Sequence, residues 1–493
     1  MFKTVSPEEA GISSRYVLQF LKALERRGLV MHSVLMMRGD DIFAEAYWKP
    51  FHRDFCHRMY SQTKSFVGIA VGLLIEDGKI SLSDCIADHF PEKTDGRILP
   101  PYLEELTVRD LLTMETAGET PRWFTHADPD RVHLYFAENS ADHPGGMLWK
   151  YDSPGSQLLS VLVEKLSGMP LMEFLRERLF SHMGSFRNAE ILKTKTEDSF
   201  GDSALLCTTR DMASFGRLLM NGGVWQGKRL MGEDFIRKAT SPKVYNDRIG
   251  FASAFTQGYG YLIWGTREGG FAFNGMGCQL TVCLPEKNFL FTCTADNQGF
   301  DSAKNLIESA LFEIIVDHLH PHPLKANPKA ALSCRRFAAS LQLMHLRGKS
   351  FSEEQNRIQG KTFVCRENPM GIRRFSFVFR EDQTGEFHYE NAQGEKCLLF
   401  GMGKNVFSKF PQDGYPTLHA GLPNTEGYRY DCAVSGIWGE ESKLLLKLQI
   451  IDRYLGNALF TFSFRGNTAV IAMEKKAEDF LKEYHGTAVA EML

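Results

Sequence analysis

The sequence predicts an α+β fold in which an antiparallel sheet is flanked by helices and a helical subdomain, followed by a β-barrel or β-sandwich domain. Strand-like runs occur at both ends of the first 320 residues with helical patterns between them, so the two ends can pair in one sheet. After residue 360 the pattern changes to alternating or aromatic strands separated by Gly, Asn and Asp turns. We therefore expect domains at residues 1–320 and 360–493, joined by a proline-containing connector at residues 321–359.

The first elements are an opening helix, a hairpin and a buried helix. The helix is expected over residues 7–27, and residues 33–48 read as two strands around a polar turn. Residues 61–76 carry apolar side chains largely at spacings of three and four, which predicts a buried helix that stops at Gly78.

The later elements begin with two helices that share a start signal, a threonine followed three places later by an aspartate. This signal resembles a capping box and predicts helices over residues 107–113 and 208–220. Residues 279–295 give two strand-like runs broken by a turn, and residues 303–319 then give a helix. A short helix is expected in the connector over residues 329–346.

The composition is that of an ordinary globular protein, with 43% hydrophobic and 24% charged residues among 493. A net charge of −3 and the lack of a Lys/Arg stripe argue against a nucleic-acid partner. The start of the chain lacks the features of a secretory signal, and no uncharged apolar run approaches the roughly 18 residues that cross a bilayer. We therefore expect no membrane association, a cytoplasmic location, and ten reduced cysteines.

A serine and a lysine, Ser61 and Lys64, stand three places apart at the start of the helix predicted over residues 61–76. Residues at this spacing share a helix face, with Cβ atoms roughly 5–6 Å apart. A serine hydroxyl becomes a nucleophile when a base takes its proton, and burial lowers the pKa of a lysine towards that role. The helix start also offers backbone N–H groups that can stabilise an oxyanion. The pair therefore predicts a serine nucleophile that needs neither histidine nor metal.

Further stretches accompany this pair along the first 320 residues. They are LTVRDLLTMETAG at 106–118, Tyr151-Asp152-Ser153, CTTRDMASFGRLLMNGG at 207–223 and GYGYLIWG at 258–265. Together with Ser61-Gln62-Thr63-Lys64, they resemble the serine β-lactamase superfamily, specifically its class C and DD-peptidase-like esterases and amidases, over about residues 7–318. The resemblance implies a β-lactamase/transpeptidase-like fold and a serine hydrolase that works through an acyl-enzyme.

The resemblance also implies roles for the second motif. Tyr151 is expected beside Lys64 as the proton shuttle, and which of the two is formally the base stays open because their protons are coupled. Ser153 could orient Lys64 or the substrate, or could simply form the turn before Pro154.

The third family motif, normally Lys-Thr-Gly or His-x-Gly on a strand, departs from its usual form. Measured back from Pro285, it falls on Phe273-Asn274-Gly275, and the N–H of Met276 would then complete the oxyanion hole. A register shifted by two would make Cys278 the donor instead. Either way the usual cation is absent, and that cation helps to seat the carboxylate of penicillins and peptidoglycan peptides. A neutral ester or amide substrate is therefore expected.

Other constellations carry less chemistry. His318, His320 and His322 alternate in a proline-containing segment without further ligands, so we expect neither a metal nor another cofactor. Trp123, Phe124 and Trp149 could line an acyl pocket or belong to the core. Acyl transfer, a D-amino-acid peptidase activity and a catalytically silent binding or assembly protein remain as alternatives. The C-terminal domain could cap the pocket, select substrates or support a homo-oligomer.

Overall fold

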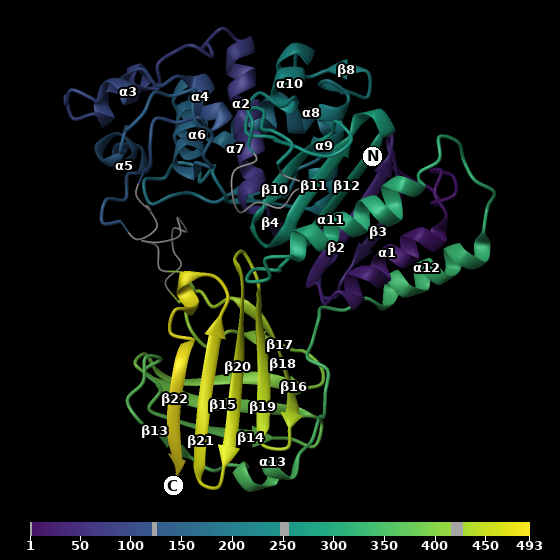
Figure 1. The fold of residues 1–493 in the computed structure, drawn as a ribbon, viewed down its shortest axis with the longest axis vertical. Helices are drawn as coiled ribbons and strands as arrows, with labels where there is room; N and C mark the ends of the chain where they lie inside the picture. The colour runs from purple at the N-terminus through teal and green to yellow at the C-terminus, as the bar shows by residue number, and fades with distance from the viewer. Residues whose placement is uncertain (1, 121–125, 247–255, 416–426) are drawn as a thin grey trace. The chain divides into compact units, whose positions relative to one another are not determined.

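A computed structural model describes residues 2–120, 126–246, 256–415 and 427–493 (Figure 1). The chain divides into two compact units. In the described part, the N-terminal unit comprises residues up to 297 together with 301–342, and the C-terminal unit comprises 298–300 and the residues from 343 onward. The connector predicted at residues 321–359 is therefore divided between the two units. Helix α12 (Pro328–Ser340) belongs to the first unit and α13 (Glu353–Ile358) to the second.

A seven-stranded sheet organises the N-terminal unit, in the order β1-β3-β2-β12-β11-β10-β9. Its pairs are antiparallel except for the edge pair β1 and β3. As predicted, the two ends of the unit meet in the centre, where β2 pairs with β12. The strands are β1 (Lys3–Thr4), β2 (Met31–Arg38), β3 (Asp41–Tyr47), β9 (Trp264–Gly265), β10 (Phe271–Gly275), β11 (Gln279–Leu284) and β12 (Phe289–Ala295).

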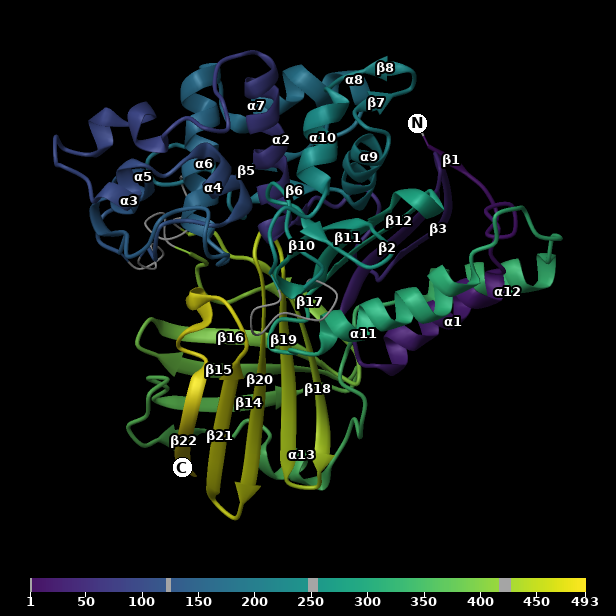
Figure 2. The same cartoon turned by 45° about the horizontal axis from the view of Figure 1, so that its top comes forward.

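Helices cover both faces of this sheet (Figures 1 and 2). On one side lie α1 (Ser14–Arg26), α11 (Ala303–Ala310) and α12, and on the other lies α9 (Thr209–Met220). The helical subdomain contains α2 (Thr63–Glu76), α3 (Pro101–Glu104), α4 (Val108–Thr113), α5 (Arg131–Glu138), α6 (Ser153–Ser167), α7 (Leu171–Leu175), α8 (Ser181–Met183) and α10 (Glu233–Thr240). Helix α2, which follows the serine of the first motif, packs against α6 and α10.

The predicted helix starts at Thr107 and Thr208 are confirmed as capping boxes. Each threonine hydroxyl accepts from the N–H three residues later, and the aspartate there accepts from the threonine N–H. The opening helix was predicted too long, because it begins at Ser14 instead of residue 7. The buried Glu8 carboxylate binds the Ser14 N–H and hydroxyl, which holds residues 7–12 in turns.

Two other helix predictions also need correction. The helix expected over residues 303–319 is α-helical only to Ala310 and continues as a π turn (Leu311–Ile315) and a 3-10 turn (Val316–His318). The helix expected over residues 329–346 ends at Ser340, because Leu341 is extended and its carbonyl accepts a hydrogen bond from Lys49.

The C-terminal unit is a barrel, which decides between the two predicted architectures. Its ten described strands follow the order β16-β15-β14-β13-β22-β21-β20-β19-β18-β17, and β16 also pairs with β18 to close the ring. Alternate side chains, such as Phe375, Phe377 and Phe387, point into its buried core. The strands are β13 (Phe363–Cys365), β14 (Arg374–Phe379), β15 (Thr384–Asn391), β16 (Gly394–Met402), β17 (Val406–Lys409), β18 (Asp431–Glu440), β19 (Lys443–Ile451), β20 (Leu455–Arg465), β21 (Thr468–Lys475) and β22 (His485–Met492).

Across the described ranges, we find no helix with both the length and the apolar character that a bilayer crossing requires.

Candidate active site

Ser61 lies in a single 3-10 turn (Tyr60–Gln62) between β4 (His57–Arg58) and α2. The turn is fastened to β6 (Leu205–Cys207), because the Met59 N–H donates to the Leu205 carbonyl over 2.8 Å. The Thr63 hydroxyl donates to the Tyr60 carbonyl over 2.6 Å and accepts from the Leu205 N–H over 3.1 Å. Tyr60 itself has a left-handed backbone, with φ of 47°. The serine is therefore presented on a tightly constrained turn.

Lys64 approaches Ser61 from the first turn of α2. Its Nζ lies 3.0 Å from the Ser61 Oγ and 2.6 Å from the backbone carbonyl of Asp202. The residue is 1% exposed. The Asp202 carbonyl fixes the amine within hydrogen-bonding distance of the serine hydroxyl, so proton exchange between the two groups needs no rearrangement.

Tyr151 also lies near the lysine, in the segment that leads into α6. The Lys64 Nζ is 5.2 Å from the centroid of the Tyr151 ring. The ring stacks on Trp264 of β9 with a centroid separation of 5.6 Å, and Trp264 in turn contacts Trp149 and Tyr259. The structure therefore brings the serine, lysine and tyrosine of the first two motifs together. Of the aromatic residues weighed for an acyl pocket, Trp149 is buried in this cluster, whereas Trp123 and Phe124 lie outside the described residues.

Asp152, the middle residue of the second motif, is half-buried next to Tyr151. Its carboxylate accepts a hydrogen bond from the Gly155 N–H and lies 3.4 Å from the Tyr135 hydroxyl oxygen. Burial raises the pKa of Asp152 to about 6, against the opposing effect of the Gly155 N–H. Ser153 begins α6, is partly exposed, and accepts a hydrogen bond at its carbonyl from the Ser156 hydroxyl.

The third motif forms the end of β10 and the turn into β11. Gly275 pairs with Gln279 across the hairpin, and Met276, Gly277 and Cys278 make the turn, with φ of 77° at Gly277. A Cβ added to Gly275 would lie 2.2 Å from the Met59 carbonyl oxygen, so the end of β10 touches the turn that carries the serine. Asn274 is buried in β10.

The buried side chain of Gln279 holds this turn in place. Its amide nitrogen donates to the Met276 carbonyl over 2.9 Å and to the Ala295 carbonyl over 2.7 Å. The two candidate oxyanion donors differ in environment, because the Met276 side chain is 45% exposed and the Cys278 side chain is buried. Burial raises the pKa of the Cys278 thiol to about 11.

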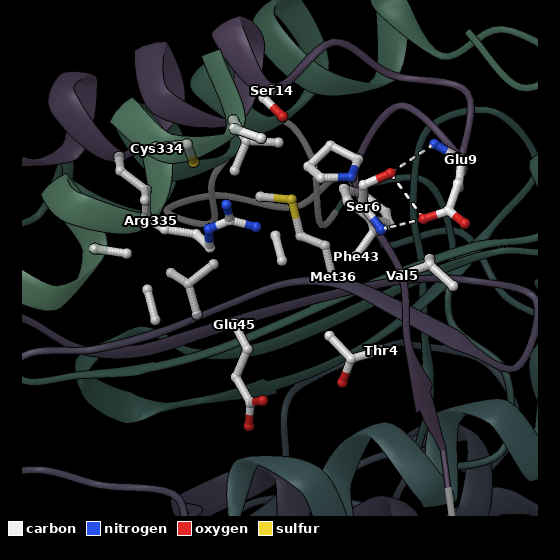
Figure 3. Close-up of a pocket in the computed structure, with 18 residues that line it drawn as sticks. Thr4, Val5, Ser6, Glu9, Ser14, Met36, Phe43, Glu45, Cys334 and Arg335 are labelled. Atoms are coloured by element: carbon white, nitrogen blue, oxygen red, sulfur yellow. Dashed lines mark hydrogen bonds between the residues drawn. The ribbon is translucent and has the colours of Figure 1, made fainter. Parts of the chain in front are cut away.

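A separate cavity of about 540 Å³ lies in the same unit, between α1, α12, β2 and β3 (Figure 3). Val17, Leu21, Val34 and Met36 contribute to its apolar lining, and Arg335 of α12 extends into it. None of the motif residues lines it, so this cavity is distinct from the site around Ser61.

Sequence reasoning missed the Asp202 carbonyl and Gln279. Asp202 acts through its backbone, which any residue carries, and Gln279 lies just beyond the third motif without a recognisable signal. Trp264 belongs to the family-like stretch at residues 258–265, but the sequence did not predict that its ring stacks on Tyr151.

A serine next to a lysine and a tyrosine, between a sheet and a helical subdomain, is the arrangement typical of one class of serine hydrolases. The family model described as beta-lactamase matches residues 15–309, more than half of the chain. The chain therefore belongs to the β-lactamase family.

Individual relatives are more distant. The chain is 28% identical over 241 residues to the 6-aminohexanoate-dimer hydrolase of Paenarthrobacter ureafaciens, a match that covers 45% of this chain and 61% of that protein. A Bacillus anthracis structure provisionally named as a 6-aminohexanoate-dimer hydrolase aligns with a TM-score of 0.52 at 20% identity, over 65% of this chain and 87% of the other. A penicillin-binding protein homologue from Caulobacter crescentus aligns with a TM-score of 0.50 at 15% identity, over 61% and 98%. These structures support the fold alone.

Proposed function

We propose that the protein is a serine hydrolase that acts through an acyl-enzyme on a small ester or amide. The observation that carries this proposal is the 3.0 Å separation between the Lys64 Nζ and the Ser61 Oγ in a buried setting. A lysine so placed can hold or receive the hydroxyl proton, and Tyr151 lies next to it.

In the first half of the reaction, the Ser61 Oγ attacks the substrate carbonyl carbon. Its proton passes to the Lys64 and Tyr151 pair, and the N–H groups of Ser61 and Met276 stabilise the oxyanion. The contact between Gly275 and Met59 favours Met276 over Cys278 as the second donor, because it sets the end of β10 against the serine turn. The pair then protonates the leaving alcohol or amine. Water attacks the acyl-enzyme in the second half and returns the proton to Ser61.

The substrate class follows from the third motif and from the relatives. Phe273 stands where the family carries a cation, so a substrate carboxylate gains no ion pair from this motif. The relative from Paenarthrobacter is named for the hydrolysis of an amide, a dimer of 6-aminohexanoate. Short esters and linear amides are therefore the favoured substrates, with β-lactams and D-alanyl peptides disfavoured.

Two variants of the proposal share the same first half. An alcohol or amine in place of water would make the protein an acyltransferase, and acceptance of D-amino-acid amides would make it a peptidase. A cytoplasmic location and a homo-oligomer remain predictions from the sequence. A silent binding protein is less favoured, because Ser61, Lys64 and Tyr151 are all present and adjacent.

Covalent labelling tests the nucleophile. A fluorophosphonate probe should add one mass increment to the native protein and none to Ser61→Ala. Ser65→Ala is the matched control, since Ser65 lies four residues further on, in α2, and its buried hydroxyl donates to the Leu262 carbonyl over 2.8 Å. No adduct on the native protein would favour the silent binding protein.

A substrate panel then separates the remaining variants. It contains p-nitrophenyl esters of varied chain length, the linear 6-aminohexanoate dimer, D-amino-acid amides and nitrocefin, each with and without an added alcohol acceptor. We expect turnover of esters or linear amides and slow turnover of nitrocefin. Efficient nitrocefin hydrolysis would contradict the argument from the missing cation.

A further inference from the structure

We propose that the outer face of the C-terminal barrel carries a zinc-type metal site made by Glu386, His388 and Cys397. This inference is independent of the proposed hydrolase function, and it concerns a different unit of the chain. In the residues that the structure describes, these three form the one group of at least three Cys, His, Asp or Glu side chains close enough to share an ion.

The strand register places the three ligands together. Glu386 and His388 are two residues apart on β15 and therefore face the same side of the barrel wall. Cys397 of β16 stands directly opposite His388 in the antiparallel ladder. The neighbouring residues Phe387 and Leu398 are fully buried in the barrel core, so the ligand side chains point outward.

The distances are close to those of a metal-bound set. The His388 Nε2 lies 2.7 Å from the Glu386 Oε2 and 4.0 Å from the Cys397 Sγ, and all three ligand atoms lie within 4.8 Å of one another. Tetrahedral zinc, with bonds of about 2.0–2.3 Å, needs ligand atoms about 3.3–3.6 Å apart. Side-chain rotations that move each ligand atom by less than about 1 Å would meet this requirement, and the backbone of the two strands would not have to change.

The ligand types select the class of metal. A thiolate, an imidazole and a carboxylate together suit zinc, whereas calcium and magnesium prefer oxygen ligands alone. The negative charges of thiolate and carboxylate would neutralise a divalent cation. All three residues are partly exposed, so water can fill the fourth position.

Arg380 supports the carboxylate from outside the group. Its guanidinium donates to the Glu386 Oε1, which leaves Oε2 on the side of His388. A hydrogen bond to the second oxygen of a ligating carboxylate is the usual outer-sphere support of a metal ligand. The ion would then tie β15 to β16 at Cys397, four residues before Gly401, where β16 begins its pairing with β18.

Zinc binding by the full-length, chelator-treated protein tests the proposal. Calorimetric titration with Zn²⁺ should show one tight site per chain, and Co²⁺ should give a thiolate-to-cobalt charge-transfer band. Cys397→Ser and His388→Ala should each weaken binding by more than about 100-fold, beyond the typical loss of an outer-sphere partner. Cys365→Ser, another partly exposed barrel cysteine, is the matched control and should leave binding unchanged.

A second measurement uses the native protein and so does not depend on the variants folding. Zn²⁺ should protect Cys397 from iodoacetamide, read by peptide mass spectrometry, while the extent of alkylation of Cys365 should stay the same with and without Zn²⁺. The proposal is overturned by the lack of a saturable site, by equal alkylation of Cys397 with and without Zn²⁺, or by zinc binding that persists in a folded Cys397→Ser variant. The last result would place the ion elsewhere, for example at the alternating histidines His318, His320 and His322.

Discussion

Gly275→Ala tests whether the contact between β10 and the serine turn matters for catalysis. The φ of −126° at Gly275 suits any residue, so the effect of a new methyl group comes from space alone. Its Cβ would lie 2.2 Å from the Met59 carbonyl oxygen, 1.2 Å inside the 3.4 Å at which ordinary contact begins. Both partners are backbone, so either β10 or the serine turn has to move.

The size of the effect follows from that displacement. A misplacement of about 1 Å can cost on the order of 100-fold in rate, and the loss of one oxyanion donor costs about 100- to 1,000-fold. We therefore expect kcat/KM for p-nitrophenyl butyrate, and the rate of fluorophosphonate labelling, to fall about 100- to 1,000-fold.

Gly385→Ala on β15 is the control, because it introduces a similar steric clash far from the serine turn in the sequence and in the other unit of the chain. Its Cβ would lie 2.3 Å from the Phe400 ring, so this variant should lose about 1–3 kcal/mol of stability and keep its kcat/KM. Wild-type kinetics in Gly275→Ala at an unchanged Tm would refute the reasoning. Equal loss of activity in both variants would assign the effect to destabilisation.

Three further substitutions have defined outcomes. Lys64→Met keeps the apolar stem and removes the amine, so fluorophosphonate labelling of a folded variant should fall at least about 100-fold, and unchanged labelling would exclude the amine from the reaction. Asp152→Asn should raise stability by up to about 3 kcal/mol at pH 8, because burial raises the pKa of Asp152 from 3.8 to about 6. Between pH 3.8 and 6 the folded state holds a proton on Asp152 that the unfolded chain releases, so the contribution of this group to wild-type stability is lost as pH rises through that range. Urea titrations should therefore show the gain in the variant at pH 8 and not at pH 4. Ala338 lines the cavity of Figure 3, so Ala338→Leu adds apolar atoms there. This variant should raise the free energy of unfolding by up to about 2 kcal/mol and leave kcat/KM unchanged. A lower Tm would mean that the cavity cannot accept the larger side chain.

Local signals in the sequence predicted much of the fold and the centre of the site. The starts of α4 and α9 were readable because a capping box is complete within four residues. The Ser61 and Lys64 pair was readable because one helical turn joins them. Interactions between distant segments were not readable in this way. The Asp202 carbonyl that fixes Lys64 lies 138 residues away, and the closure of the barrel depends on a pairing between β16 and β18 that no local pattern encodes.

The serine turn shows why such distant contacts matter for chemistry. A non-glycine residue with positive φ, here Tyr60, costs on the order of 1–3 kcal/mol and persists only where its surroundings fix it. Three separate segments supply that constraint, namely β6 through Leu205, β10 through Gly275, and β11 through the Thr281 hydroxyl, which donates to the Gln62 amide oxygen over 2.8 Å. The reactive geometry is therefore a property of the assembled sheet and subdomain, since the motif residues alone cannot hold it. Loosening β10 or β11 should consequently reduce acylation before it unfolds the protein.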